Sequence, residues 1–124
     1  ISGTLVVGGL SAAGYALVGL PGVSFAFGFG VVYATYEVIH RRLHTAAPLN
    51  AYGRWARRHH FYHHFADARR NHGVTTPLWD HVFRTFSRAE TLRVPPRLAM
   101  DWLLDDAGAI RPQFAAEYHL GGRR

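Results

Sequence analysis

The chain has 124 residues, which allows one small domain at most, and its apolar residues gather before residue 40 instead of spreading as a soluble core requires. The absence of cysteine excludes disulfides, thiolate zinc sites and cysteine-based redox chemistry, so any metal must be held by His, Asp, Glu or backbone groups. The formal net charge is +6 and no lysine is present, so that arginine carries the positive charge; this balance indicates nucleic acid or anionic lipid as a partner.

The first part of the chain, from Thr4 to Ile39, is an apolar stretch whose one acidic residue is Glu37 and which has no Lys or Arg. It is longer than one membrane span requires, and Pro21-Gly22 interrupts it. Two helices of about 17 residues would each cover about 25 Å, enough to cross a bilayer with slight thinning. We therefore predict a transmembrane helical hairpin over residues 1–39 that turns at Pro21-Gly22. Because Ile1 already lies inside the apolar run, we expect sequence to be missing upstream.

Small residues recur at every fourth position on both expected helices, a spacing that lets helix backbones approach closely in lipid. The open alternative is that Gly and Ala are simply common in apolar segments. A signal peptide fits poorly, because no basic segment precedes the run and a second run follows it. The small residues are Gly8, Ala12 and Ala16 on the first helix and Gly22, Ala26, Gly30 and Ala34 on the second.

Arginines begin directly after the second expected span, at Arg41 and Arg42, and continue to Arg70. The positive-inside rule places this end of the hairpin in the cytoplasm. The stretch "RWARRHHFYHHFADARR" interleaves basic and aromatic groups as single-strand nucleic-acid binders do. Since it follows a hydrophobic hairpin directly, we interpret the arginines as membrane topology signals and expect no nucleic-acid partner.

Eight of the nine histidines fall between His40 and His81. "HRRLH" places His40 and His44 four residues apart, on one face of a helix that continues out of the second span. "HFYHH" places His60, His63 and His64 on one face of another helix. Two such helices can bring their imidazoles to a shared metal site, and imidazole suits Fe, Zn, Cu and Ni alike.

Five aligned histidines exceed the needs of one zinc ion, so a two-metal site fits better. The zinc-protease motif H-E-x-x-H is excluded, since Arg41 stands where its Glu would be. Glu37 and Asp67 each lie one helical turn from a proposed ligand and could accept a ring N–H. The alternative for the cluster is a solvated helix at the membrane interface whose histidines bind no metal and have no other function. We interpret the remaining histidines of this region as structural or exposed: His59, His72 and His81.

The chain beyond the histidines has weaker signals. Asn71 and Gly73 suit a tight, left-handed turn, and Pro77 suits the start of a short helix. Thr91–Pro96 is typical of an extended or loop segment, and a short helix is expected after Pro95-Pro96, with Leu98, Trp102 and Leu103 on its apolar side. We predict an all-α protein with a membrane hairpin at 1–39, a helical histidine-box region at 40–90 and a C-terminal tail at 91–124.

The ordered set "YEVIHRRLHT", "RHHFYHHF" and "NHGVTTPLWDHVFRT" resembles the C-terminal half of the fatty acid hydroxylase/sterol desaturase superfamily, whose members are membrane oxygenases with a histidine-box di-iron centre. The resemblance covers Tyr36 to Thr85 and implies that His40, His44, His60, His63 and His64 are metal ligands. Arg84 stands where members often carry glycine. The family's earlier histidine boxes are absent, so this chain would hold part of the ligand set and be inactive alone.

The resemblance implies a membrane enzyme that uses two iron ions and O2 to hydroxylate, or in some members desaturate, a C–H bond of a lipid. It also implies an external electron donor and histidine boxes on the cytoplasmic side. The alternative hypothesis is a non-catalytic membrane protein that binds metal or haem through the same histidines.

Overall fold

The computed structural model describes residues 3–121 and is mostly helical. The prediction of an all-α fold is only partly right, because two short strands pair in parallel within this part of the chain. The α-helices are α1 (Gly3–Val18), α2 (Leu20–Thr45), α3 (Ala51–Phe65) and α4 (Leu78–Val82); the 3-10 helices are η1 (Pro96–Leu98) and η2 (Pro112–Phe114); the strands are β1 (Leu92–Val94) and β2 (Tyr118–Leu120).

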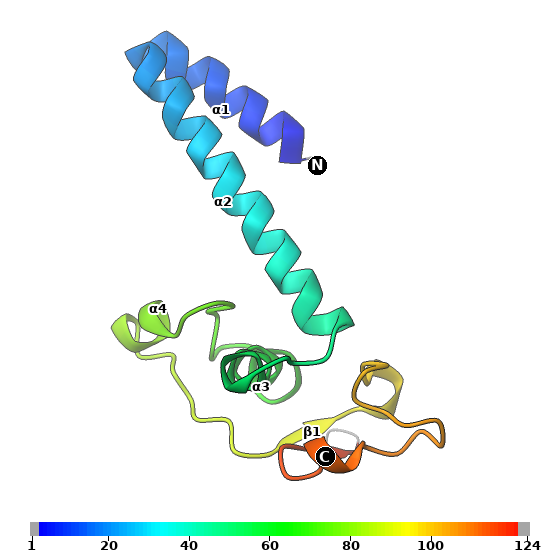
Figure 1. Cartoon of the computed structure of the whole chain (residues 1–124). Coiled ribbons are helices and arrows are strands. Elements are labelled where there is room, and N and C mark those ends of the chain that lie inside the picture. Colours follow the sequence, from blue (N-terminus) through cyan, green and yellow to red (C-terminus); the bar gives the residue numbers. More distant parts are fainter. Residues whose placement is uncertain (1–2, 122–124) are drawn as a thin grey trace. The chain divides into compact units, whose positions relative to one another are not determined.

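The chain divides into two compact units, Ile1–Val38 and Ile39–Arg124. In the first unit, α1 and the beginning of α2 form a helical hairpin (Figure 1). Its turn lies at Gly19, not at Pro21-Gly22 as predicted. Gly19 has a φ of 72°, the left-handed conformation that ends helices, and Pro21 is accommodated in the first turn of α2, where its missing N–H costs nothing.

Close backbone contact between the hairpin helices occurs where Gly14 of α1 meets Gly22 of α2, so that a Cβ on either residue would collide with the other backbone. Farther along α2, Ala26 is buried and Gly30 faces Val7. The predicted small-residue face of α2 is therefore confirmed at three of its positions. The predicted face of α1 is wrong: its small residues Gly8, Ala12 and Ala16 are exposed.

Of the described helices, α2 is long and apolar enough to cross a membrane, by length and composition. Helix α1 is apolar but has only 16 residues. The structure thus supports one membrane span of the two predicted. Helix α2 continues without a break to Thr45, which carries the predicted pair His40 and His44 out of the apolar segment.

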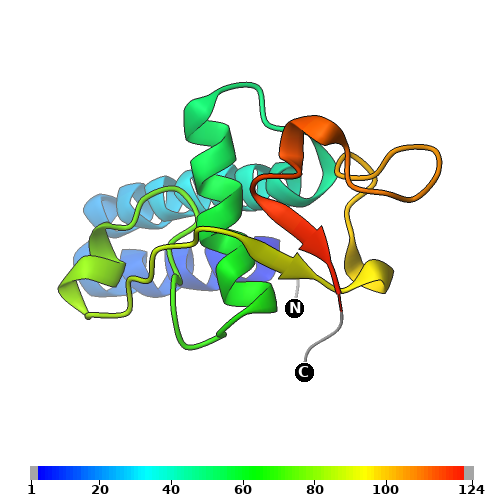
Figure 2. The same ribbon diagram turned by 90° about the horizontal axis from the view of Figure 1, so that it is seen from below.

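The second unit is built around α3, whose Phe61 is fully buried. Strand β1 contacts α3 and pairs with β2 in the register Leu92↔Tyr118 and Val94↔Leu120, and Figure 2 shows the two arrows side by side next to α3. Alternate residues of β1 point inward because successive side chains of a strand point to opposite faces. The core comprises Phe61, Leu92, Val94, Met100, Trp102, Leu103, Phe114 and Tyr118.

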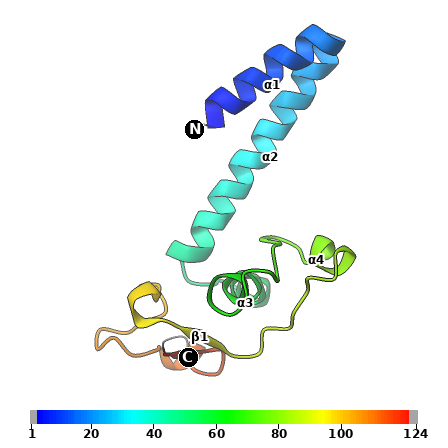
Figure 3. The same ribbon diagram turned by 180° about the vertical axis from the view of Figure 1, so that it is seen from behind.

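The segment after residue 90 differs from the prediction in its local structure. Leu92–Val94 is extended, one of the two predicted alternatives, but the helix predicted after Pro95-Pro96 is a single 3-10 turn, η1, because Ala99 already has an extended backbone. Trp102 and Leu103 are nevertheless buried, in turns instead of a helix. The segment is therefore an integral part of the second unit, and an extended connection joins it to α4 (Figure 3).

Candidate metal centre

Four histidines from two helices meet in the second unit. His40 and His44 lie one turn apart at the end of α2, and His60 and His64 lie one turn apart on α3. One ring nitrogen from each lies within 4.8 Å of the corresponding nitrogens of the other three. The structure thus brings together four of the five histidines predicted as ligands.

The nitrogen spacing in this His cluster suits a shared ion. His60 Nε2 lies 3.0 Å from His44 Nε2 and 3.0 Å from His64 Nε2. Two nitrogens that are each about 2.1 Å from one ion lie roughly 3.0–3.4 Å apart. A neutral imidazole nitrogen carries either one proton or one lone pair, so His60 Nε2 cannot satisfy both contacts as full hydrogen bonds. A cation would accept all of these lone pairs.

A second observation on His60 concerns its other ring nitrogen, Nδ1. Its Nδ1 atom is buried and has no hydrogen-bond partner among residues 3–121. When Nε2 of a neutral imidazole offers its lone pair to a metal, Nδ1 carries the proton, so the His60 Nδ1–H is then a buried donor without an acceptor among these residues. No carboxylate of the described residues enters the cluster, which leaves imidazoles as its ligands.

The electrostatics keep the cluster neutral. Burial, reinforced by the neighbouring imidazoles, lowers the pKa of His60 to about 2. Burial followed by the charges of His63 and His40 also lowers the pKa of His64. Both rings are therefore unprotonated near neutral pH and present their lone pairs, the form that binds metal.

His63, the fifth predicted ligand, lies outside the cluster. It is half-buried, its Nδ1 lies 2.9 Å from the Arg70 carbonyl oxygen, and its ring packs against His72 at a centroid distance of 5.0 Å. Because a carbonyl only accepts, Nδ1 must donate, and Nε2 is left with its lone pair. On α3 a residue at i+3 is rotated by about 60° from the position that His60 and His64 share, which explains the separation.

Arg57 fixes the turn between the two ligand-bearing helices, a role that the sequence analysis missed. It is 6% exposed, and its guanidinium donates to the carbonyl oxygens of Ala46 at 2.6 and 3.0 Å and of Arg42 at 3.0 Å. It also donates to Gly53 O at 3.0 Å. The side chain therefore satisfies carbonyls at the end of α2 while belonging to α3.

The C-terminal segment also supports the cluster. Trp102 donates its Nε1–H to the His44 carbonyl oxygen at 3.1 Å and stacks on Phe61. The Phe61 ring in turn packs against the His44 ring at 5.2 Å. Trp102 thus holds His44 in place although the two residues lie 58 positions apart. The spacing of the histidines could not predict this contact.

Comparison with known proteins identifies similar proteins and a family. The fatty acid hydroxylase family model matches residues 1–85. The chain belongs to the fatty acid hydroxylase family. It is 35% identical over 68 residues to a dihydroceramide fatty acyl 2-hydroxylase of Arabidopsis thaliana, covering 54% of this chain and 29% of that protein. It is 36% identical over 67 residues to the fatty acid 2-hydroxylase of Homo sapiens, covering 53% of this chain and 18% of that protein.

The aligned part thus spans less than a third of these two relatives. No solved structure matches the chain. The family match confirms the resemblance that the histidine motifs indicated and includes all five predicted ligands.

Within the family match, Asp80 organises the loop that follows α3. It is 1% exposed, and its carboxylate accepts hydrogen bonds from the backbone N–H groups of His72 and Gly73 and from the Thr85 hydroxyl, at 2.7–2.9 Å. His59 Nε2 lies 3.0 Å away as a fourth partner. Burial alone would raise the pKa of Asp80, but these hydrogen bonds outweigh it and lower the pKa to about 2.

This loop contains Asn71 and Gly73, for which the sequence analysis predicted a tight turn. Asn71 has a φ of 53°, as predicted, whereas Gly73 is required for another reason: a Cβ there would collide with the Thr76 carbonyl oxygen. Arg84 also has a left-handed φ of 58°. The prediction for Asp67 is wrong, since its carboxylate accepts from Arg69 instead of a histidine ring.

The other histidines of the family region lie outside the His cluster. His59 is buried against Asp80 and stacks between Trp55 and Phe86. His72 and His81 are exposed. The structure gives none of the three a place among the clustered nitrogens.

Proposed function

We propose that this chain forms part of a membrane-bound, O2-dependent hydroxylase that acts on a C–H bond of a fatty acyl chain. The observation that carries the proposal is the convergence of four imidazole nitrogens within 4.8 Å in a chain of the fatty acid hydroxylase family. The names of the two relatives favour carbon 2 of the acyl chain as the position of attack.

The proposed ligands of one ion are His40, His44, His60 and His64. His63 is the candidate ligand of a second ion. Its Nδ1–H donates to the Arg70 carbonyl oxygen, so the lone pair for metal binding is on Nε2. Bound iron would supply the activation of O2 that oxygen insertion into an unactivated C–H bond requires. Imidazole ligands are compatible with iron, although they do not select it over zinc or copper.

The protein groups around the cluster hold the ligands in their metal-binding form. Burial keeps His60 and His64 neutral, and the Arg70 carbonyl fixes the tautomer of His63. The rings of Phe61 and Trp102 cover one side of the cluster with apolar surface. This surface restricts the access of water, which protects a reactive oxidising site from side reactions.

The setting proposed for this chemistry is the membrane surface. Helix α2 is long and apolar enough to cross a bilayer, and arginines follow its apolar part at positions 41 and 42. We propose that the His cluster lies on the cytoplasmic side, in reach of lipid substrate from the bilayer and of an external electron donor. A flavin- or nicotinamide-binding motif is not recognisable in the sequence.

The experiment that tests the proposal is mass spectrometry of acyl lipids from a host without 2-hydroxylated lipids that expresses the full-length protein. We expect 2-hydroxylated acyl chains with the native sequence and with the control variant His119→Ala, and none with His64→Ala at equal protein level. Product formation that survives His64→Ala would contradict the ligand assignment.

A further inference from the structure

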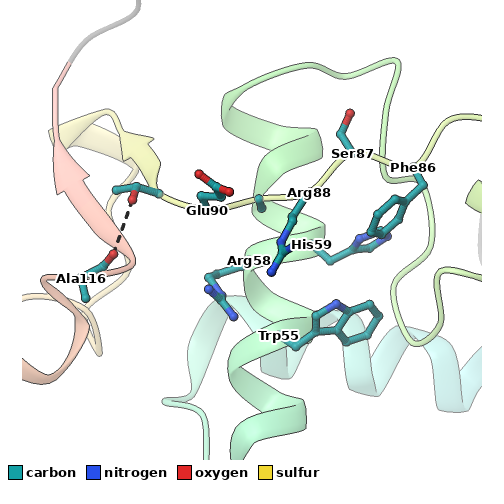
Figure 4. Close-up of a pocket in the computed structure, with 10 residues that line it drawn as sticks. Trp55, Arg58, His59, Phe86, Ser87, Arg88, Glu90 and Ala116 are labelled. Carbon is teal, nitrogen blue, oxygen red and sulfur yellow. Dashed lines mark hydrogen bonds between the residues drawn. The ribbon is translucent and has the colours of Figure 1, made fainter.

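A cavity lies in the second unit, on the face of α3 turned away from His60 and His64. Its volume is about 600 Å³. Trp55, Arg58 and His59 line it from α3, and the segment from Phe86 to Thr91 lines it from the other side (Figure 4). Residues three and four apart share a helix face, which places Trp55, Arg58 and His59 together and apart from the His cluster.

Two of the polar residues that line this cavity are arginines without a bonding partner. Arg58 and Arg88 both line it, and Figure 4 shows their side chains reaching toward the same space from the two sides. Neither guanidinium has a hydrogen-bond or ion-pair partner among residues 3–121. The Nε atom of Arg58 is buried as well, and a buried N–H without an acceptor is costly.

The aromatic lining is a stack of three rings. His59 lies between Trp55, at a centroid distance of 5.1 Å, and Phe86, at 5.8 Å, with interplanar angles of 23° for both. The bond to Asp80 holds the middle ring of the stack in place. The cavity thus combines a rigid aromatic wall with two cations, and its volume is far larger than a bare inorganic anion needs.

We propose that this cavity binds a phosphate ester, with the phosphate held by Arg58 and Arg88 and its organic substituent against the aromatic wall. A guanidinium presents parallel N–H donors that match phosphate oxygens, and two of them can balance a phosphate dianion. Glu90 lines the same cavity and opposes an anion, so it weakens the site. The proposal does not depend on the metal centre, because none of these residues belongs to the His cluster.

The test is isothermal titration calorimetry on the full-length protein in uncharged detergent, with a short-chain phosphatidic acid and with glycerol 3-phosphate as probes. We expect Arg58→Gln and Arg88→Gln each to raise the Kd about tenfold or more. Glu90→Gln should lower it roughly two- to fivefold. The matched control Arg97→Gln removes an exposed arginine outside the cavity and should change nothing. Metal content should be unchanged in all four variants.

The two probes distinguish the sources of the phosphate. Binding of phosphatidic acid alone assigns the cavity to a lipid headgroup, and equally tight binding of glycerol 3-phosphate assigns it to soluble phosphate esters; both results support the site. Because Arg88 is exposed, Arg88→Gln should fold even if Arg58→Gln does not. The proposal is overturned if neither probe binds the native protein, or if Arg88→Gln and Arg97→Gln weaken binding equally.

Discussion

At the scale of single residues, His60 is the centre of the His cluster. Its Nε2 contacts two other imidazole nitrogens, its Nδ1 is buried without a partner, and the ring is 3% exposed. A protonated imidazolium at this position would be buried among other imidazoles, and its Nδ1–H would have no acceptor among residues 3–121. The folded protein therefore resists protonation of His60, and the same property makes the ring a metal ligand at neutral pH.

His60 predicts a pH dependence of the metal-free protein. The unfolded chain protonates this histidine near pH 6.5, whereas the folded chain does so only at about pH 2. Between these values the unfolded state binds more protons, so the free energy of unfolding falls as the pH falls below about 6.5. Thermal unfolding of chelator-treated protein should show a melting temperature lower by roughly 5 °C or more at about pH 5 than at about pH 7.5.

The control for this experiment is His60→Gln, which cannot titrate. Its melting temperature should depend less on pH over the same range, with a residual slope from His64, whose pKa is also lowered. An equal slope in the native protein and in His60→Gln would show that His60 is not the group responsible.

At the scale of secondary-structure elements, the site depends on the turn between α2 and α3. The spacing of the histidines predicted which residues share a helix face, because a helix repeats every 3.6 residues. It could not predict how the two helices meet. That arrangement depends on Arg57 and on Trp102, whose partners lie 11 and 58 positions away in the chain.

Arg57→Lys tests this turn. Lysine keeps the charge but cannot reach the Ala46, Arg42 and Gly53 carbonyls together, because it lacks the planar fork of donors. We expect a loss of about 2–3 kcal/mol in the free energy of unfolding, measured by urea denaturation, together with weaker metal retention. Arg97→Lys, at an exposed position, is the control. Stability within about 0.5 kcal/mol of the native protein in Arg57→Lys would contradict this role.

Gly14 and Gly8 both lie on α1, and they serve as the test position and its control. A Cβ on Gly14 would lie 2.9 Å from the Gly22 carbonyl oxygen, whereas a Cβ on Gly8 would meet nothing within 4 Å. Gly14→Val should therefore destabilise the hairpin by about 1–3 kcal/mol, measured by unfolding in mixed micelles of rising SDS fraction, and Gly8→Val should have little effect. Equal behaviour of the two variants would exclude this helix contact.

At the scale of the whole molecule, the sequence predicted the long helix that carries His40 and His44, the convergence of four of the five proposed ligands from two helices, and the family. The turn at Gly19 was missed because Pro21-Gly22 is a stronger local turn signal, yet a proline fits the first turn of a helix equally well. The buried hub Asp80 and the packing of Trp102 and Tyr118 around Phe61 were missed because they depend on contacts between distant residues. Periodicity carries no information on such contacts.

The central claim is that the His cluster binds metal, and elemental analysis of the full-length protein purified from membranes tests it most directly. We predict iron in stoichiometric amount, close to two ions per chain, which is lost in His60→Ala and retained in the control His119→Ala. A folded native protein without stoichiometric metal, or a His60→Ala variant with the native metal content, would contradict the account.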